Sequence, residues 1–168
     1  MKFNRRIIPD IKSNQSFITK KRLKEDEIDF DKLRSYRLDR VKKELEKNNL
    51  EACILFDPVN IRYALDTVNM SIHNMHNLNR YCFIPVKGPI ILYEYFNCEK
   101  LSEHLNLIDE IRPSITWDYF SNGDQASNQL KKWINEVNDL SNSYFKSKKI
   151  AIDVINGPAV TALNKSGI

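Results

Sequence analysis

Apolar and polar positions along the chain predict helices that alternate with buried strands. From residue 31 to 49, leucine and valine recur at helical spacing among charged residues, which predicts an amphipathic helix. Asp29 or Asp31 can cap its start, and Asn48-Asn49 can end it, because asparagine tolerates the left-handed conformation. The short apolar run 52–56 follows, and such a run is typical of a strand buried on both faces.

The middle of the chain predicts a β-hairpin. Two apolar runs, 80–86 and 89–95, are joined by Lys87-Gly88, which is typical of a hairpin with a two-residue loop. A short helix is expected at 99–107. The next run, 108–117, contains a proline, which cannot donate a backbone hydrogen bond, so this run is expected to be an edge strand.

The remaining pattern completes an α/β arrangement. A strong helical period covers 125–145, an apolar strand covers 149–154, and Gly157-Pro158 opens a helix that runs into the chain end. Helices alternating with buried strands around one hairpin predict an α/β fold with a mixed β-sheet flanked by helices. No strand follows the last helix, so we expect the last part of this architecture to be truncated.

The first thirty residues differ from the rest. They are polar and lack a clear period, which predicts a basic N-terminal arm at 1–30 and a domain at 31–168 that is incomplete at its C-terminus. The net charge is +4, but the basic run 20–24 is followed at once by three acids, 25–27. Such rapid alternation of charge sign is typical of a solvated tail, so nucleic-acid binding is not the favoured interpretation.

Size and composition exclude several classes of protein. A chain of 168 residues with 42% apolar residues suits one soluble domain, and no apolar run approaches the roughly 20 residues of a membrane helix. No secretory signal opens the chain, so a cytoplasmic protein is expected. Three cysteines without C-x-x-C spacing argue against a disulfide framework and a zinc ribbon, and four scattered glycines argue against a phosphate-binding loop.

The segment 56–77, FDPVNIRYALDTVNMSIHNMHN, concentrates polar residues directly after an apolar strand. His73 and His76 stand three residues apart and would share one face of a helix, but a metal needs further ligands. Asp66 is near them in sequence and Glu94 could be near in space, yet no tight cluster emerges, so polar loop histidines are the favoured interpretation.

Acidic residues at predicted strand ends raise the alternative of a small nuclease or another acid/base enzyme. The candidates are Asp57, Asp66, Glu94 and Asp153. The chain has 22 acidic residues, however, so some must fall at strand ends by chance.

The residues after the first strand have a structural interpretation. Asp57-Pro58 stops the strand, Asn60 is expected to cap a short helical turn, and Tyr63 is expected to point its ring back into the domain. We therefore interpret Asp57, Pro58, Asn60 and Tyr63 as a structural motif and not as catalytic residues.

This motif also carries a resemblance to a known family. A helix, an apolar strand ending in DPVNIRY (57–63), a polar loop and a hairpin resemble the N-terminal domain of the creatinase/prolidase/Xaa-Pro aminopeptidase family. The likeness covers 31–168, including the closing strand and helix at 148–163, and implies the family's ribonuclease H-like fold. The peptidases usually carry Leu-Thr-Gly after the tyrosine, whereas this chain has ALD (64–66). That departure, with His76-Asn77 following, resembles the sub-branch that contains a dimethylsulfoniopropionate lyase.

The resemblance implies that catalysis takes place in a second, C-terminal domain. In this family a C-terminal "pita-bread" domain binds divalent metal ions through Asp, Asp, His, Glu and Glu, so no catalytic residue, metal ligand or cofactor is expected in this chain. Family members are commonly homodimers in which the N-terminal domain of one subunit leans over the active site of the other. The expected partners are therefore the C-terminal domain, a second subunit and a small peptide or small zwitterionic substrate, with no membrane.

The resemblance also suggests what the polar segment does. The loop after the motif helps to form the active site in creatinase-like enzymes, so its amides, imidazoles and guanidinium could orient a small anionic substrate. The candidates are Asn69, His73, His76, Asn77 and Arg80. The full-length enzyme is expected to be an Xaa-Pro peptidase-like metallohydrolase. One alternative is a lyase that releases dimethyl sulfide and acrylate, and another is a stand-alone binding domain whose basic arm contacts an acidic partner or RNA.

Overall fold

The computed structural model describes residues 28–168. Residues Leu33–Ile168 form the second of the chain's two units. The predicted basic arm therefore lies almost wholly outside the described residues. Asp29 caps the first described helix, α2 (Phe30–Lys47), by accepting a hydrogen bond from the backbone N–H of Lys32 over 2.9 Å.

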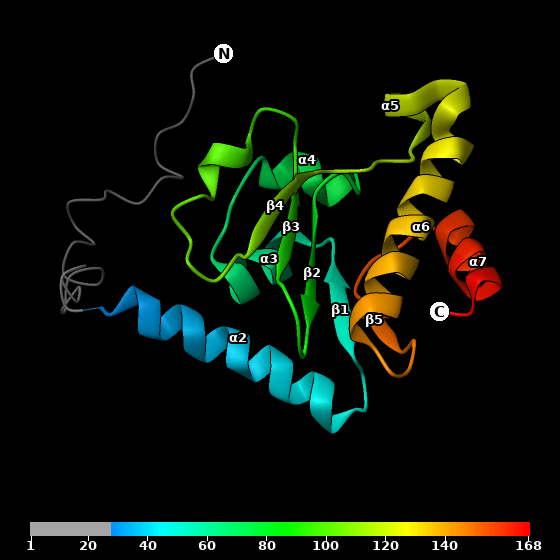
Figure 1. The fold of residues 1–168 in the computed structure, drawn as a ribbon. Coiled ribbons are helices and arrows are strands. Elements are labelled where there is room, and N and C mark those ends of the chain that lie inside the picture. The colour runs from blue at the N-terminus through cyan, green and yellow to red at the C-terminus, as the bar shows by residue number, and fades with distance from the viewer. Residues whose placement is uncertain (1–27) are drawn as a thin grey trace, which may run out of the picture. The chain divides into compact units, whose positions relative to one another are not determined.

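A five-stranded mixed sheet forms the centre of the second unit (Figure 1), with strand order β4-β3-β2-β1-β5. The strands are β1 (Ala52–Leu55), β2 (Tyr81–Pro85), β3 (Ile91–Glu94), β4 (Glu110–Pro113) and β5 (Ile150–Ile152). β2 pairs antiparallel with both β1 and β3, whereas β4 runs parallel to β3 and β5 runs parallel to β1. The predicted α/β fold with a mixed sheet is confirmed, and the 108–117 segment does supply an edge strand.

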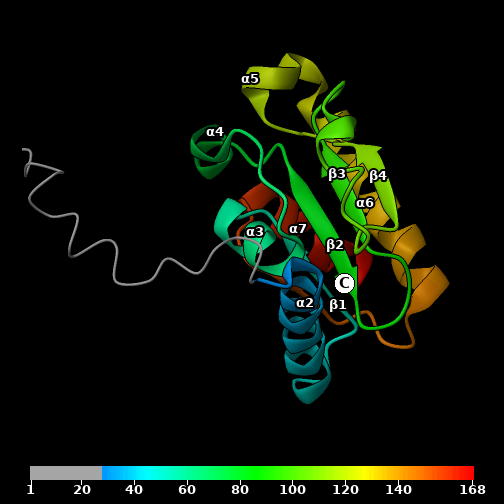
Figure 2. The ribbon, with the colours of Figure 1, turned by 90° about the vertical axis from the view of Figure 1, so that its left-hand side faces the viewer.

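Helices cover both faces of the sheet (Figure 2). Side chains alternate along a strand, so Ile54 of β1 points to one face and Cys53 to the other. On the first face, the sheet packs against α6 (Ala126–Tyr144) and α7 (Gly157–Ser166). On the second, it packs against α2 and α3 (Pro58–Leu65). Strand β1 is thus buried on both sides, as its unbroken apolar run predicted.

Several predicted elements have the expected bounds. Helix α2 ends at Lys47, two residues before Asn49, which adopts the left-handed conformation with φ 56°. Helix α6 falls within the predicted range, and both Trp133 and Ile134 are buried along its inner side. The helix predicted at 99–107 is wrong, because only Glu99–Leu101 forms a helical turn, of 3-10 type.

The hairpin connection is longer than predicted. Strand β2 ends at Pro85 and β3 begins at Ile91, so residues 86–90 join them in place of a two-residue loop. Gly88 lies in this connection with φ 124°, a conformation that favours glycine. A Cβ atom there would lie 3.0 Å from the Tyr144 ring, so the close approach of α6 also requires a glycine.

The polar segment after β1 holds two helices where the sequence predicted a loop with one helical turn. Helix α3 begins at Pro58, and α4 (Ser71–His76) follows a short connection. The cap of α3 is Asp57, whose carboxylate accepts hydrogen bonds from the backbone N–H groups of Val59 and Asn60. The prediction that Asn60 is the cap is therefore wrong, because Asn60 already lies inside the helix.

Candidate functional site

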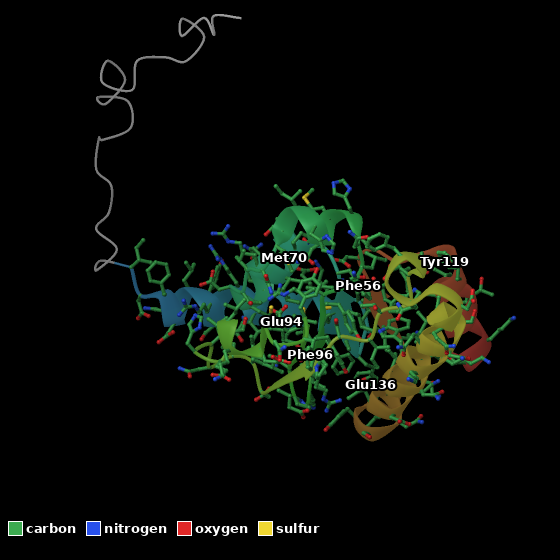
Figure 3. The ribbon with its side chains drawn as sticks, turned by 90° about the horizontal axis from the view of Figure 1, so that it is seen from above. Phe56, Met70, Glu94, Phe96, Tyr119 and Glu136 are labelled. Carbon is green, nitrogen blue, oxygen red and sulfur yellow. The ribbon has the colours of Figure 1, made fainter. Side chains whose placement is uncertain are left out.

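Four strands have their carboxyl ends on the same side of the sheet, which we call the carboxyl edge. Because β2 is antiparallel to β1 and β3, the carboxyl ends of β1, β3, β4 and β5 all meet there. Helices α4 and α5 (Tyr119–Asn122) lie beyond this edge (Figure 1), and Figure 3 looks onto it from above. Ligands of open α/β sheets bind outside the carboxyl ends of the strands, so this edge is the natural place to search for a site.

Where β1 and β5 end side by side, carboxylates accept hydrogen bonds from backbone N–H groups. Asp153 follows β5, and its carboxylate accepts hydrogen bonds from the backbone N–H groups of Phe56 and Asp57 over 2.8 and 3.0 Å. It also accepts a hydrogen bond from the side-chain amide of Asn60 over 3.1 Å. Asp57 caps α3 and Asp153 binds the backbone after β1, so both acids stabilise the fold.

A buried ion pair lies where β2 begins and β3 ends. Arg80 directly precedes β2 and Glu94 ends β3, one step beyond the cross-strand pair Tyr81–Tyr93. Their side chains are 1% and 0% exposed, and the Arg80 Nε atom donates to Glu94 Oε2 over 2.8 Å. Such a charged hydrogen bond is short and directional, so it fixes the relative position of the two side chains.

Further hydrogen bonds extend this pair toward α4. Glu94 Oε1 accepts from the side-chain amide of Asn69 over 3.0 Å and from the backbone N–H of Tyr95 over 2.9 Å. Arg80 Nη2 donates to the hydroxyl of Thr67 over 2.6 Å, and Thr67 is hydrogen-bonded in turn to Ser102. We call Arg80, Glu94, Thr67, Asn69 and Tyr95 the Glu94 network.

The network meets α4 through Asn74. The Tyr95 hydroxyl donates a hydrogen bond to Asn74 Oδ1, while Asn74 Nδ2 donates to the backbone carbonyl of Asn69 over 2.6 Å. Burial raises the pKa of Tyr95 to about 12. The Tyr95 hydroxyl is therefore protonated at neutral pH and acts as the donor.

The two predicted histidines lie on the outer surface of α4. His73 and His76 are both exposed, and the side-chain amide of Asn77 lies 3.4 Å from His73 Nδ1. A hollow of about 570 Å³ is lined by Met70, Ser71, Ile72, His73, His76 and Asn77. The structure thus brings His73, His76 and Asn77 together around one surface feature.

Two other candidates lie elsewhere than the sequence suggested. Arg80 was expected to contact a substrate directly, but it is buried and its guanidinium is bound by Glu94 and Thr67. Asn69 likewise faces inward to Glu94. The prediction that Tyr63 points into the domain is wrong, because the residue is 39% exposed and the Arg37 guanidinium lies 5.7 Å from the ring centre.

The roles of Glu94, Asn74 and Tyr95 were not predicted from the sequence. One signal was available for Glu94, which lies within the apolar run 89–95, since a charge in a buried strand requires a buried partner. No comparable signal existed for Asn74 and Tyr95. Their contact joins positions 21 residues apart and depends on how α4 folds back over the sheet edge.

The described residues do not offer the ligand set of a catalytic metal. In 28–168 no three side chains of the types His, Cys, Asp and Glu gather at one place. The oxygen donors considered with the histidines are engaged, because Asp66 pairs with Arg34 over 2.9 Å and Glu94 pairs with Arg80. Within the same range, no helix is long and apolar enough to cross a membrane.

Comparison with known proteins links the chain to two groups of enzymes. No protein-family model matches it. It is 29% identical over 140 residues to the dimethylsulfoniopropionate lyase DddP of Roseovarius nubinhibens and 29% identical over 136 residues to that of Roseobacter denitrificans. These matches cover 83% and 80% of this chain but 31% and 30% of the relatives. The chain therefore spans about a third of the length of the curated relatives it matches.

Solved structures share the fold at lower identity. An Xaa-Pro aminopeptidase from Streptococcus pyogenes superposes with a TM-score of 0.54 and 14% identity over 81% of this chain and 88% of that one. An Xaa-Pro dipeptidase from Bacillus anthracis gives a TM-score of 0.52 and 10% identity over 80% of this chain and 31% of that one. These comparisons confirm that the chain shares its fold with Xaa-Pro peptidases and resembles the lyase-containing branch in sequence.

Proposed function

We propose that this chain is the non-catalytic N-terminal domain of a pita-bread metalloenzyme, and that α4 shapes the substrate site of that enzyme. The catalytic metal ions would be held by a C-terminal domain. The substrate site would belong to the same subunit or to a second subunit of a cytoplasmic homodimer.

The outward face of α4 is the observation that carries this proposal. Ile72 and Met75 are 78% and 64% exposed, although apolar side chains of a surface helix normally face the core. The same helix exposes both histidines at the carboxyl edge of the sheet. A surface that combines apolar and hydrogen-bonding side chains in this way is suited to face a second protein surface and a small polar ligand.

The task of these residues is to bind and orient a substrate. Imidazole N–H groups of His73 and His76 and the amide of Asn77 can donate hydrogen bonds to a carboxylate. Orientation by such groups lowers the entropic cost of bringing the reacting bond to the catalytic groups. The divalent metals of the catalytic domain would supply the Lewis acid, and the described residues would supply positioning.

Two reactions remain as candidates. Similarity to the curated lyases favours an enzyme that releases dimethyl sulfide and acrylate from dimethylsulfoniopropionate, which is a small zwitterion with a carboxylate. The fold shared with Xaa-Pro peptidases favours hydrolysis of a small peptide whose second residue is proline. The lyase is the first candidate because the identity to the lyases is higher and covers as much of this chain.

Kinetics of the full-length protein test this proposal. His73→Ala and His76→Ala should each lower kcat/KM by about tenfold, the loss expected when a hydrogen bond to a charged group disappears. Release of dimethyl sulfide and hydrolysis of an Xaa-Pro dipeptide should be measured side by side, so that the same variants identify the reaction.

His104→Ala is the matched control. His104 is the third histidine of the chain, is exposed and lies outside the α4 hollow, so its replacement should leave kcat/KM unchanged. If His73→Ala and His76→Ala behave like His104→Ala with both substrates, α4 does not contact the substrate and the proposal is wrong.

A further inference from the structure

Helix α4 is not held in place by burial of apolar side chains, as most surface helices are. It has only six residues, which is too short for a helix to be stable by itself. No side chain caps its N-terminus, where Met70 adopts the left-handed conformation with φ 35°. Its single buried residue is Asn74, while its apolar side chains Ile72 and Met75 face outward. Apolar burial by its own residues therefore cannot explain its position.

The hydrogen bonds of Asn74 can explain it. Both ends of the Asn74 side-chain amide are bound, one by the Tyr95 hydroxyl and the other by the Asn69 carbonyl. These two residues are themselves fixed by one carboxylate oxygen of Glu94, which accepts from the Asn69 amide and the Tyr95 backbone N–H. Glu94 therefore contacts both residues, Asn69 and Tyr95, that hold the Asn74 side chain of α4.

We propose that Glu94 and Tyr95 are positioning residues that hold α4, and with it His73 and His76, in the orientation required at the substrate site. The ion pair with Arg80 fixes the Glu94 carboxylate, the carboxylate fixes Asn69 and Tyr95, and these two hold Asn74. The functional meaning of this arrangement rests on the proposed substrate role of α4. The physical coupling itself is a property of this chain.

A charged network suits this task better than an apolar contact. Apolar packing is not directional, so a short helix resting on it could slide or rotate. Hydrogen bonds to a buried carboxylate are directional, and each costs free energy when it is broken because the groups left behind are not solvated. The Arg80 and Glu94 side chains are excluded from water, so breaking their contacts would leave charged groups without solvation.

The arrangement also gives His73 a defined neighbour. Its ring centre lies 6.0 Å from that of Tyr95, so the residue that donates to Asn74 also lies beside the first histidine of the outer face. A shift of Tyr95 should therefore change both the attachment of α4 and the surroundings of the His73 imidazole.

Tyr95→Phe tests the coupling, because it removes only the hydroxyl that donates to Asn74. Amide hydrogen exchange of the intact chain should show the α4 amides of Asn74 and Asn77 exchanging about tenfold faster, with the melting temperature nearly unchanged. The His73 imidazole resonances in the NMR spectrum should shift, while those of His104 should not. Asn74→Ala removes both attachments of α4 and should speed the exchange of the Asn77 amide at least as much as Tyr95→Phe does.

Tyr93→Phe is the matched control. Its hydroxyl donates to Glu136 over 2.6 Å on the opposite face of the sheet, so its loss should leave α4 exchange and the His73 resonances unchanged. A second variant, Asn69→Ala, removes one donor to Glu94 from a half-buried site and should also speed α4 exchange.

Exchange of α4 in Tyr95→Phe and Asn69→Ala that stays within twofold of the native chain would overturn the inference. Both readouts use this chain without substrate or catalytic domain. A failure here therefore concerns the anchor of α4, whereas unchanged kinetics of the histidine variants concerns the proposed substrate role.

Discussion

The buried polar residues at the sheet edge show how far single positions can be interpreted from sequence. Glu94, at the end of β3, required a buried partner, and Arg80, directly before the paired strand β2, was within reach. From the sequence, Arg80 was nevertheless expected to contact the substrate, because a loop arginine beside asparagines and histidines resembles an anion site. Only the cross-strand register shows that its guanidinium lies beside Glu94.

The cysteines give a direct test of burial at single residues. Burial raises the pKa of the Cys53 thiol to about 12 and also raises the pKa of Cys82, whereas Cys98 is only half-buried. Both buried thiols therefore stay protonated and shielded at about pH 8, so iodoacetamide should modify only Cys98 in the native chain. Mass spectrometry should show one modified cysteine, and all three in urea. Modification of Cys53 or Cys82 as fast as Cys98 would contradict the burial of β1 and β2.

At the scale of elements, long periodic segments could be predicted and short irregular ones could not. Helices α2 and α6 have enough turns for their apolar period to be unambiguous, and the apolar run of β1 indicated a central strand. Helix α4 escaped prediction because its apolar residues face outward, so the usual pattern of a surface helix is inverted. The helix predicted at 99–107 failed because only its first turn forms.

The hairpin connection provides a test at this scale. Gly88→Ala should lower the free energy of unfolding by more than about 1 kcal/mol, because its positive φ disfavours a side chain and the Tyr144 ring occupies the space. Urea unfolding measures this loss. Gly157→Ala, at a position where a Cβ meets nothing within 4 Å, is the control and should cost nothing comparable. Equal stabilities for the two variants would refute the described packing of α6 against this loop.

For the whole molecule, fold and sequence similarity point to the same architecture. The mixed sheet superposes on Xaa-Pro peptidase structures, and the matched segment makes up about a third of the curated lyases. The fold could be predicted from sequence because the DPVNIRY element, the helix before it and the hairpin after it occur in a characteristic order. The reaction could not, since the residues that distinguish a lyase from a peptidase are expected in the catalytic domain.

The central claim is that α4 serves a metal-dependent active site whose ligands are encoded after this segment. Reading the coding sequence downstream of the codon for Ile168 tests it most directly. We expect an uninterrupted reading frame of domain size, on the order of 200 codons, that encodes Asp, Asp, His, Glu and Glu in this order. A stop codon immediately after Ile168 would contradict it, because the chain would then have no catalytic domain for α4 to serve.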